Sequence, residues 1–126
     1  MRRCVLTSSG YAIFQPDQAD RPADNIFNET MWSNPDRAGG MDPYPKSKVL
    51  AEKVAWDFVA ALPADQKFEL VAILPAFVLG PPLRKDTFFS GEWLKSLMEG
   101  KMDPILDLKI CVADVRDVAR AHLLGI

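Results

Sequence analysis

The stretch GGMDPYPKSKVLAEKVAWDF, residues 39–58, decides the fold, because it predicts one long helix in the middle of the chain. Asp42 is suited to cap this helix, and Pro43 fits its first turn, where no amide hydrogen is needed. Pro63 ends the pattern. We therefore expect a helix over residues 42–62, and the flanking segments determine what it packs against.

Two apolar strips run along this expected helix. The main strip has apolar residues at every fourth position, a spacing typical of a helix face that packs on a domain. Its members are Leu50, Val54 and Phe58, with Ala51, Ala55, Val59 and Leu62 on the adjoining arc. A second, smaller strip consists of Val49, Trp56 and Ala60. We expect this smaller strip to contain a partly exposed tryptophan or to form a dimer contact.

Short apolar runs on both sides of the helix predict strands. They lie at residues 3–9 (RCVLTSS) and 70–74, where Pro75 ends the run, and at residues 108–114 (LKICVAD). Further helices are expected at residues 89–101, ended by Gly100, and 114–125, capped by Asp114. Strands that alternate with helices predict an α/β fold with a parallel sheet. Three strands are few for such a sheet, so the chain resembles the second half of a domain.

The composition favours one globular domain without a membrane or nucleic-acid role. The chain has 126 residues, 48% of them hydrophobic, and its fifteen basic and seventeen acidic residues give a net charge of −2 without a basic cluster. No apolar stretch approaches the ~18–20 residues that span a bilayer, and the N-terminus has no secretory pattern. We therefore expect a cytoplasmic protein.

Metal binding is not indicated either. The chain has Cys4, Cys111 and a single histidine, His122, which are too few for a zinc site. Both cysteines lie in strand-like runs, so we expect them to be buried, reduced thiols. We expect His122 to have a structural role.

Tyr44 and Lys48 lie four positions apart, so their side chains share one face of the expected helix. A positive charge beside a phenol favours its ionised form, which suits general acid–base catalysis. Ala51 and Ala55 continue this face with small side chains. The spacing alone is a weak signal, and it fits an ordinary exposed tyrosine and lysine equally well.

Five segments of the chain together carry a family resemblance. They are YPKSKVLAEK (44–53), VLTSSG (5–10), NETMWSNPD (28–36), ILPAFVLGPPL (73–83) and VADVRDVARAHLLG (112–125). In this order they resemble the extended short-chain dehydrogenase/reductase family. The form Tyr-x-x-Ser-Lys-x-x-Ala-Glu looks like the branch of the dihydroflavonol reductases, cinnamoyl-CoA reductases and yeast-type aldehyde reductases.

The resemblance implies a catalytic serine before the helix. Ser9 is the last hydroxyl before Gly10, and its distance along the sequence from Tyr44 is typical of this branch. Its hydroxyl would hydrogen-bond the substrate carbonyl and the alkoxide that forms from it. Ser8 is the alternative catalytic serine. Its competing interpretation is structural, as a hydroxyl that satisfies backbone groups at the end of the strand.

The resemblance also implies the remaining roles. Tyr44 would donate a proton as hydride arrives at the carbonyl carbon, and Lys48 would assist it while binding the nicotinamide ribose. Pro75 and Val78 would offer backbone contacts to the nicotinamide end, or form a plain turn. Trp32 would line a substrate pocket or pack on the core.

One hallmark of the family is absent from these residues. None of the seven glycines forms the Gly-x-x-Gly-x-x-Gly loop that binds the cofactor pyrophosphate. We therefore expect residues 1–126 to form part of a Rossmann-like NAD(P)-binding domain with a doubly wound parallel sheet, and substrate-side loops at about 10–40 and 84–105. The expected activity is reduction of an aldehyde or ketone, or oxidation of the alcohol, with NADP favoured over NAD. The alternatives are a non-catalytic, partner-dependent module, and an epimerase or hydroxysteroid dehydrogenase with the same residues.

Overall fold

Strands and helices alternate along the chain, as expected from the sequence. The computed structural model describes residues 2–84, 89–102 and 110–126. The elements are β1 (Arg3–Thr7), 3-10 helices η1 (Gly10–Ala12) and η2 (Gln18–Asp20), α1 (Pro43–Ala61), β2 (Glu69–Ile73), β3 (Phe77–Leu79), α2 (Phe89–Met98), β4 (Val112–Asp114) and α3 (Val115–Gly125). All the strand pairs formed by these residues are parallel, which confirms the predicted α/β class.

The strands form two pairs rather than one sheet. Strand β1 pairs with β2, and β3 pairs with β4. The expected strand at 70–74 is thus followed by a second one, β3, after an interruption at Pro75. The hydrogen bonding between β1 and β2 continues one residue beyond β1, because the N–H of Ser8 donates to the carbonyl of Ile73 at 2.8 Å. The N–H of Gly10 likewise donates to the carbonyl of Pro75 at 2.9 Å.

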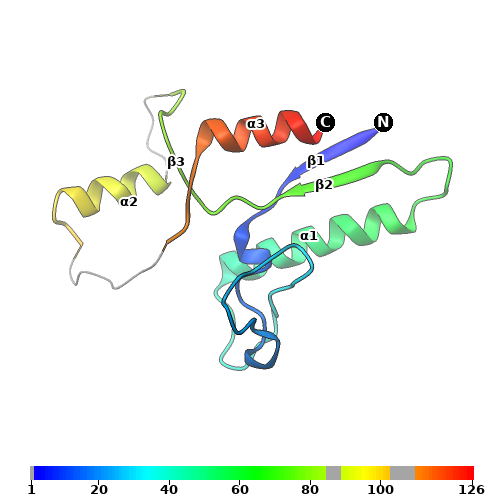
Figure 1. Cartoon of the computed structure of the whole chain (residues 1–126), viewed down its shortest axis with the longest axis horizontal. Coiled ribbons are helices and arrows are strands. Elements are labelled where there is room, and N and C mark those ends of the chain that lie inside the picture. Colours follow the sequence, from blue (N-terminus) through cyan, green and yellow to red (C-terminus); the bar gives the residue numbers. More distant parts are fainter. Residues whose placement is uncertain (1, 85–88, 103–109) are drawn as a thin grey trace.

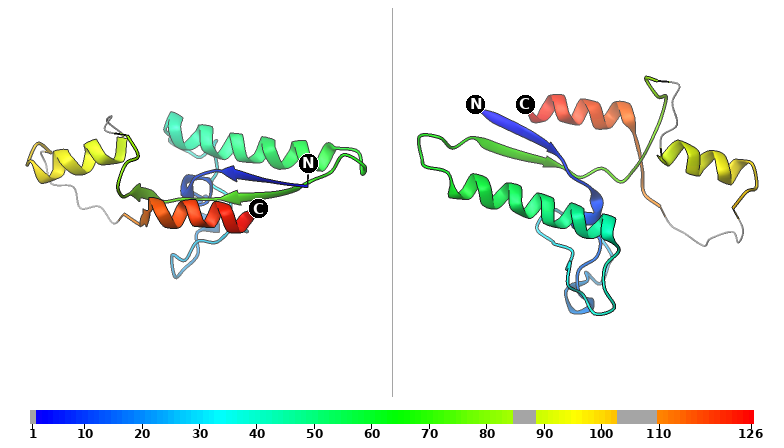
Figure 2. Two further views of the ribbon diagram at one scale, coloured as in Figure 1. Left: turned by 90° about the horizontal axis from the view of Figure 1, so that it is seen from above. Right: turned by 180° about the vertical axis from the view of Figure 1, so that it is seen from behind.

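Helices α1 and α3 cover opposite faces of the β1–β2 pair, as Figures 1 and 2 show. Helix α2 lies apart from them and packs on β3, where the rings of Phe77 and Trp93 are 5.2 Å apart. Residues 10–40 gather beyond the N-terminal end of α1 (Figure 1). The two ends of the chain meet, and the guanidinium of Arg3 donates to the carbonyl of Ile126 at 2.9 Å.

Helix α1 has nearly its predicted bounds, but it packs with a different face. The main apolar strip is exposed: Leu50, Val54 and Phe58 are 44%, 65% and 60% accessible to solvent. The prediction for this strip was wrong. The buried residues of α1 are instead Pro45, Val49 and Glu52.

The spacing explains why this packed face was missed. Pro45, Val49, Glu52 and Trp56 follow one another at intervals of four, three and four residues, which places all four on one face. A proline and a glutamate interrupt its hydrophobic pattern, so hydropathy favoured the neighbouring strip. Burial of Glu52 then depends on hydrogen-bond partners that only the folded chain provides.

The later elements agree with the sequence with small differences. The Asp114 side chain caps α3 by accepting the N–H of Arg116 at 2.8 Å, as predicted. The hydrogen bonds and the charge of Arg116 lower the pKa of Asp114 to about 2. Gly100, with φ +66°, follows the end of α2. The predicted strand at 108–114 is described only from residue 110, and β4 occupies its last three positions. Both cysteines were predicted to be buried, but Cys111 is exposed and Cys4 is only half-buried.

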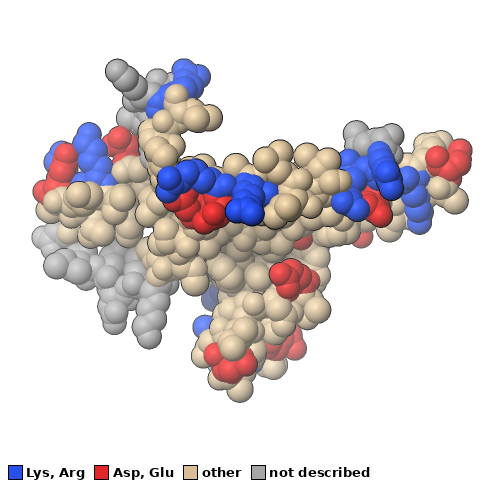
Figure 3. Space-filling view, turned by 45° about the horizontal axis from the view of Figure 1, so that its top comes forward, with Lys and Arg blue, Asp and Glu red and all other residues tan. Residues whose placement is uncertain are grey.

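The surface shows no strong charge segregation. On the face in Figure 3, basic and acidic side chains are interspersed in small groups, with a broad uncharged area between them. Within the described ranges, no helix combines the length and apolar character needed to cross a bilayer.

Candidate active site

Tyr44 and Lys48 occupy the first two turns of α1. The Nζ atom of Lys48 lies 5.6 Å from the centroid of the Tyr44 ring, within the range of a cation–π contact. The Tyr44 side chain is exposed, so a ligand can reach its hydroxyl. Among the described residues Lys48 forms no ion pair, whereas the adjacent Lys46 is paired with Asp36 at 3.0 Å. The pair therefore presents an accessible phenol with its own ammonium beside it.

Ser9 is connected to Tyr44 indirectly, through Tyr11. Its Oγ accepts the N–H of Tyr11 at 3.3 Å and thereby caps η1. The ring of Tyr11 meets that of Tyr44 edge-on, with centroids 5.9 Å apart and planes at 88°. The segment that follows Ser9 thus packs against the first turn of α1. Among the described residues Ser9 forms no hydrogen bond to Tyr44 or Lys48.

The two candidate serines have different surroundings. Both are 8% exposed, but the Oγ of Ser8 donates to the carboxylate of Glu52. The hydroxyl of Ser9 accepts a backbone N–H and donates to no group in the described part of the chain. Ser9 therefore retains a hydrogen that a ligand oxygen can accept, whereas that of Ser8 is already engaged.

Pro75 lies between β2 and β3, and Val78 is the middle residue of β3. The carbonyl of Pro75 accepts the N–H of Gly10, which places Pro75 beside the turn that follows Ser9. The N–H of Phe77 donates to the carbonyl of Cys111, the residue before β4, at 3.0 Å. Because backbone groups alternate sides along a strand, the N–H and carbonyl of Val78 point away from β4. They face the edge of β3 that pairs with no strand in the described part of the chain.

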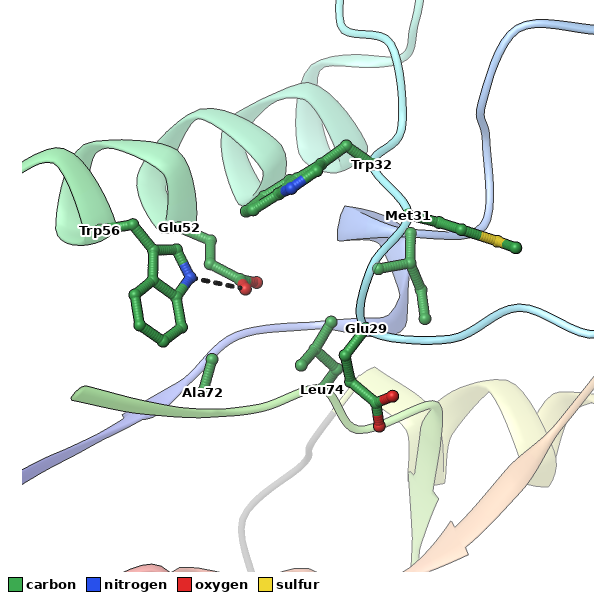
Figure 4. Close-up of a pocket in the computed structure, with 8 residues that line it drawn as sticks. Glu29, Met31, Trp32, Glu52, Trp56, Ala72 and Leu74 are labelled. Atoms are coloured by element: carbon green, nitrogen blue, oxygen red, sulfur yellow. Dashed lines mark hydrogen bonds between the residues drawn. The ribbon is translucent and has the colours of Figure 1, made fainter. Parts of the chain in front are cut away.

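A buried polar cluster behind these residues was not predicted. Glu52 is 5% exposed and accepts Ser8 at one carboxylate oxygen and the indole Nε1–H of Trp56 at the other, at 3.2 Å. Figure 4 shows Glu52 between Trp56 and Trp32 at the edge of a pocket of about 280 Å³. The pocket is lined by Ile13, Glu29, Met31, Trp32, Glu52, Trp56, Ala72 and Leu74. The available signal was a glutamate four residues before a tryptophan on the face that also carries Val49.

The loop between β1 and α1 is held by a serine that is fully buried. The Oγ of Ser33 donates to the carbonyl of Tyr11 at 2.7 Å and accepts the N–H of Gln15 at 2.8 Å. In the adjacent residue, Trp32, the ring centroid lies 5.3 Å from the Nζ atom of Lys53, a cation–π contact. These contacts hold the loop against η1 and α1, and the hydrogen bond from Ser33 fixes the backbone of Tyr11.

His122, which was predicted to be structural, lies outside this site. His122 is bonded to Thr7 Oγ1 at 2.7 Å and to the carbonyl of Val118 at 2.8 Å, which joins α3 to β1. Nowhere in residues 2–84, 89–102 and 110–126 do three or more His, Cys, Asp or Glu side chains form a group able to hold a metal ion.

No protein-family model matches the chain, but individual proteins do. It is 38% identical to NADPH-dependent methylglyoxal reductase GRE2 of Saccharomyces cerevisiae, with 99% of the chain and 39% of that protein covered. It is 31% identical to cinnamoyl-CoA reductase 1 of Arabidopsis thaliana, with 98% of the chain and 35% of that protein covered.

Solved structures give the same result. Gre2 of Candida albicans, crystallised as an NADPH complex, matches at 32% identity with a TM-score of 0.71. The match covers 98% of this chain and 39% of the Gre2 chain. Vestitone reductase of alfalfa matches at 28% identity with a TM-score of 0.76, and the match covers 98% of this chain and 38% of that protein's chain. The chain thus spans about two fifths of the length of the proteins that it matches.

Proposed function

We propose that this chain carries the proton-transfer part of an NADPH-dependent carbonyl reductase. Its homologues are Rossmann-fold reductases of the extended short-chain dehydrogenase/reductase family, in the dihydroflavonol and cinnamoyl-CoA reductase branch. One observation carries the proposal. The ammonium of Lys48 lies beside the ring of an accessible Tyr44, and the segment after Ser9 packs against the same ring.

The proposed substrate is an aldehyde or ketone, and the reverse reaction takes the corresponding alcohol. NADPH supplies the hydride when it is bound. The hydroxyl of Ser9 donates to the carbonyl oxygen and stabilises the charge that develops there. Tyr44 donates its proton to that oxygen, and the ammonium of Lys48 stabilises the phenolate that remains.

The described residues fit one end of the cofactor. Lys48 has free donors for ribose hydroxyls, and Val78 offers an N–H and a carbonyl at the open edge of β3. The carbonyl of Pro75 has one lone pair left after it accepts Gly10. No Gly-x-x-Gly-x-x-Gly loop for the pyrophosphate occurs among the 126 residues. We assign residues 1–126 to part of a cofactor-binding domain in the cytoplasm, with the segments 10–40 and 84–105 on the substrate side. The second segment contains α2, and its residues 85–88 and 103–105 lie outside the described residues.

Titration of the chain with NADPH, followed by cofactor fluorescence, tests the proposal. We expect saturable binding below millimolar NADPH and oxidation of the cofactor when an aldehyde is added. Tyr44→Phe should reduce turnover at least ~100-fold, because it removes the proton donor. It should leave the dissociation constant within about twofold, because the ring and Lys48 are kept.

Tyr11→Phe is the matched control, since it removes a hydroxyl from the ring that contacts Tyr44. Its turnover should stay within about threefold of the unmodified chain. Equal losses in both variants would contradict the role given to Tyr44. Absence of binding at millimolar NADPH would favour the non-catalytic, partner-dependent module.

A further inference from the structure

The buried carboxylate of Glu52 joins two elements that carry proposed catalytic residues. Glu52 lies one turn after Lys48 on α1, and Ser8 immediately precedes Ser9 at the end of β1. The backbone N–H of Ser8 is bonded to Ile73 in the neighbouring strand, so only its side chain is directed at the helix. One hydrogen bond therefore connects the sheet directly to α1.

The carboxylate of Glu52 accepts a hydrogen bond from both partners at once. Ser8 and the Trp56 indole are both donors here, and they bind different oxygens of Glu52. A glutamine at this position has the same shape but one oxygen and one NH₂ group, so it keeps both partners only if the Ser8 hydroxyl turns round to accept, and it loses the charge that strengthens both hydrogen bonds. The negative charge of Glu52 is thus matched to this pair of partners rather than tolerated by chance.

Such a contact matters for reacting groups because catalysis depends on distance. A displacement of about 1 Å can reduce a rate ~100-fold when it separates reacting groups. Only Ala12 and Val49 form a buried apolar core among the described residues, so packing alone constrains α1 weakly. The Glu52 hydrogen bonds supply a directional constraint at this point.

We propose that Glu52 is a positioning residue, which holds α1 at the distance from β1 that places Ser9 opposite Tyr44 and Lys48. This inference rests on the proposed function of those three residues. Ser8 is then the partner through which Glu52 acts, and Trp56 orients the carboxylate from the pocket side.

The contact between the Tyr11 and Tyr44 rings provides a direct geometric readout. It is measured as the nuclear Overhauser effect between the two rings in the isotope-labelled chain, at a temperature where circular dichroism shows a folded protein. Glu52→Gln should reduce this effect at least twofold and shift the indole N–H resonance of Trp56. The matched control is Asp57→Asn, an exposed acid on the same helix, which should change neither.

Trp56→Phe is a second variant for the case in which Glu52→Gln does not fold. It removes one donor, keeps an aromatic ring in the pocket, and should give a smaller loss of the ring contact. Ser8→Ala combined with Glu52→Gln should be no worse than Glu52→Gln alone, because both remove the same link. A folded Glu52→Gln chain with an unchanged ring contact would overturn the proposal, as would additive effects of the two substitutions.

Turnover separates this inference from the proposed function. If the chain reduces aldehydes, Glu52→Gln should lower kcat about tenfold, equivalent to ~1.4 kcal/mol, with KM within about twofold. If the unmodified chain does not bind NADPH but its ring contact depends on Glu52, the proposed function fails and the positioning contact stands. A lower melting temperature with unchanged kcat would reduce Glu52 to a structural residue and refute its positioning role.

Discussion

Two valines on α1 provide the sharpest test of how this helix packs. Val49 is fully buried, whereas Val54 is 65% exposed on the strip that hydropathy favours. Replacing either with alanine changes the intrinsic helix propensity equally, by at most ~0.7 kcal/mol in favour of alanine. The difference between the two variants therefore reports burial alone.

The magnitude follows from the atoms removed. Val49→Ala takes two buried carbon groups out of the core, each worth ~0.8 kcal/mol of transfer free energy, and a cavity term adds to this. We expect a loss of about 2–3 kcal/mol in the free energy of unfolding. Val54→Ala should change it by no more than ~0.5 kcal/mol. Because m-values in urea are ~1–3 kcal/mol/M, the unfolding midpoints should differ by about 0.5–3 M.

The assay is urea unfolding followed by far-ultraviolet circular dichroism, with sedimentation at the same concentration to verify that the chain is monomeric. Equal midpoints, or a larger loss for Val54→Ala, would refute this packing. Such a result would mean that the strip of Leu50, Val54 and Phe58 is covered after all. An association seen only at high concentration would locate that cover in a second copy.

Three further substitutions test separate parts of the structure. Ser33→Ala should lower the free energy of unfolding by about 1–3 kcal/mol, because it removes the buried hydroxyl that supports the loop; thermal unfolding measures the loss. Gly80→Ala should cost about 1–3 kcal/mol by the same assay, since its φ is +137° and an added Cβ would lie 2.7 Å from Val115 in α3. Asp114 has a pKa lowered to about 2 by Arg116, so its contribution is complete above the usual value of 3.8 and is lost as pH falls toward 2. Melting temperatures between pH 5 and 2 should therefore fall less steeply in Asp114→Asn, and an unchanged slope would contradict this linkage.

Local sequence chemistry was sufficient to predict the elements near the site. Pro43 and Pro63 bound α1 to within two residues of the observed helix, because proline restricts the backbone regardless of what surrounds it. Asp114 caps α3 for a similarly local reason. The position of Tyr44 and Lys48 on one face also followed from helix geometry alone, since it depends only on their spacing.

The hydrogen bond between Ser8 and Glu52 could not be predicted in this way. The two residues lie 44 positions apart, and no periodicity relates a strand end to a helix face. The interruption at Pro75 was visible, but the pairing of β3 with β4 depended on a strand contributed much later in the chain.

The sequence by itself determined the α/β order, the bounds of α1 and the local pairing of Tyr44 with Lys48, because each depends on neighbours within a few residues. Only the tertiary structure decided which face of α1 is buried and which serine hydroxyl remains available to a ligand. The physical reason is the same in both cases. A glutamate is expelled from a packed face unless two donors reach it, and those donors, Ser8 and Trp56, come together only when β1 and α1 meet.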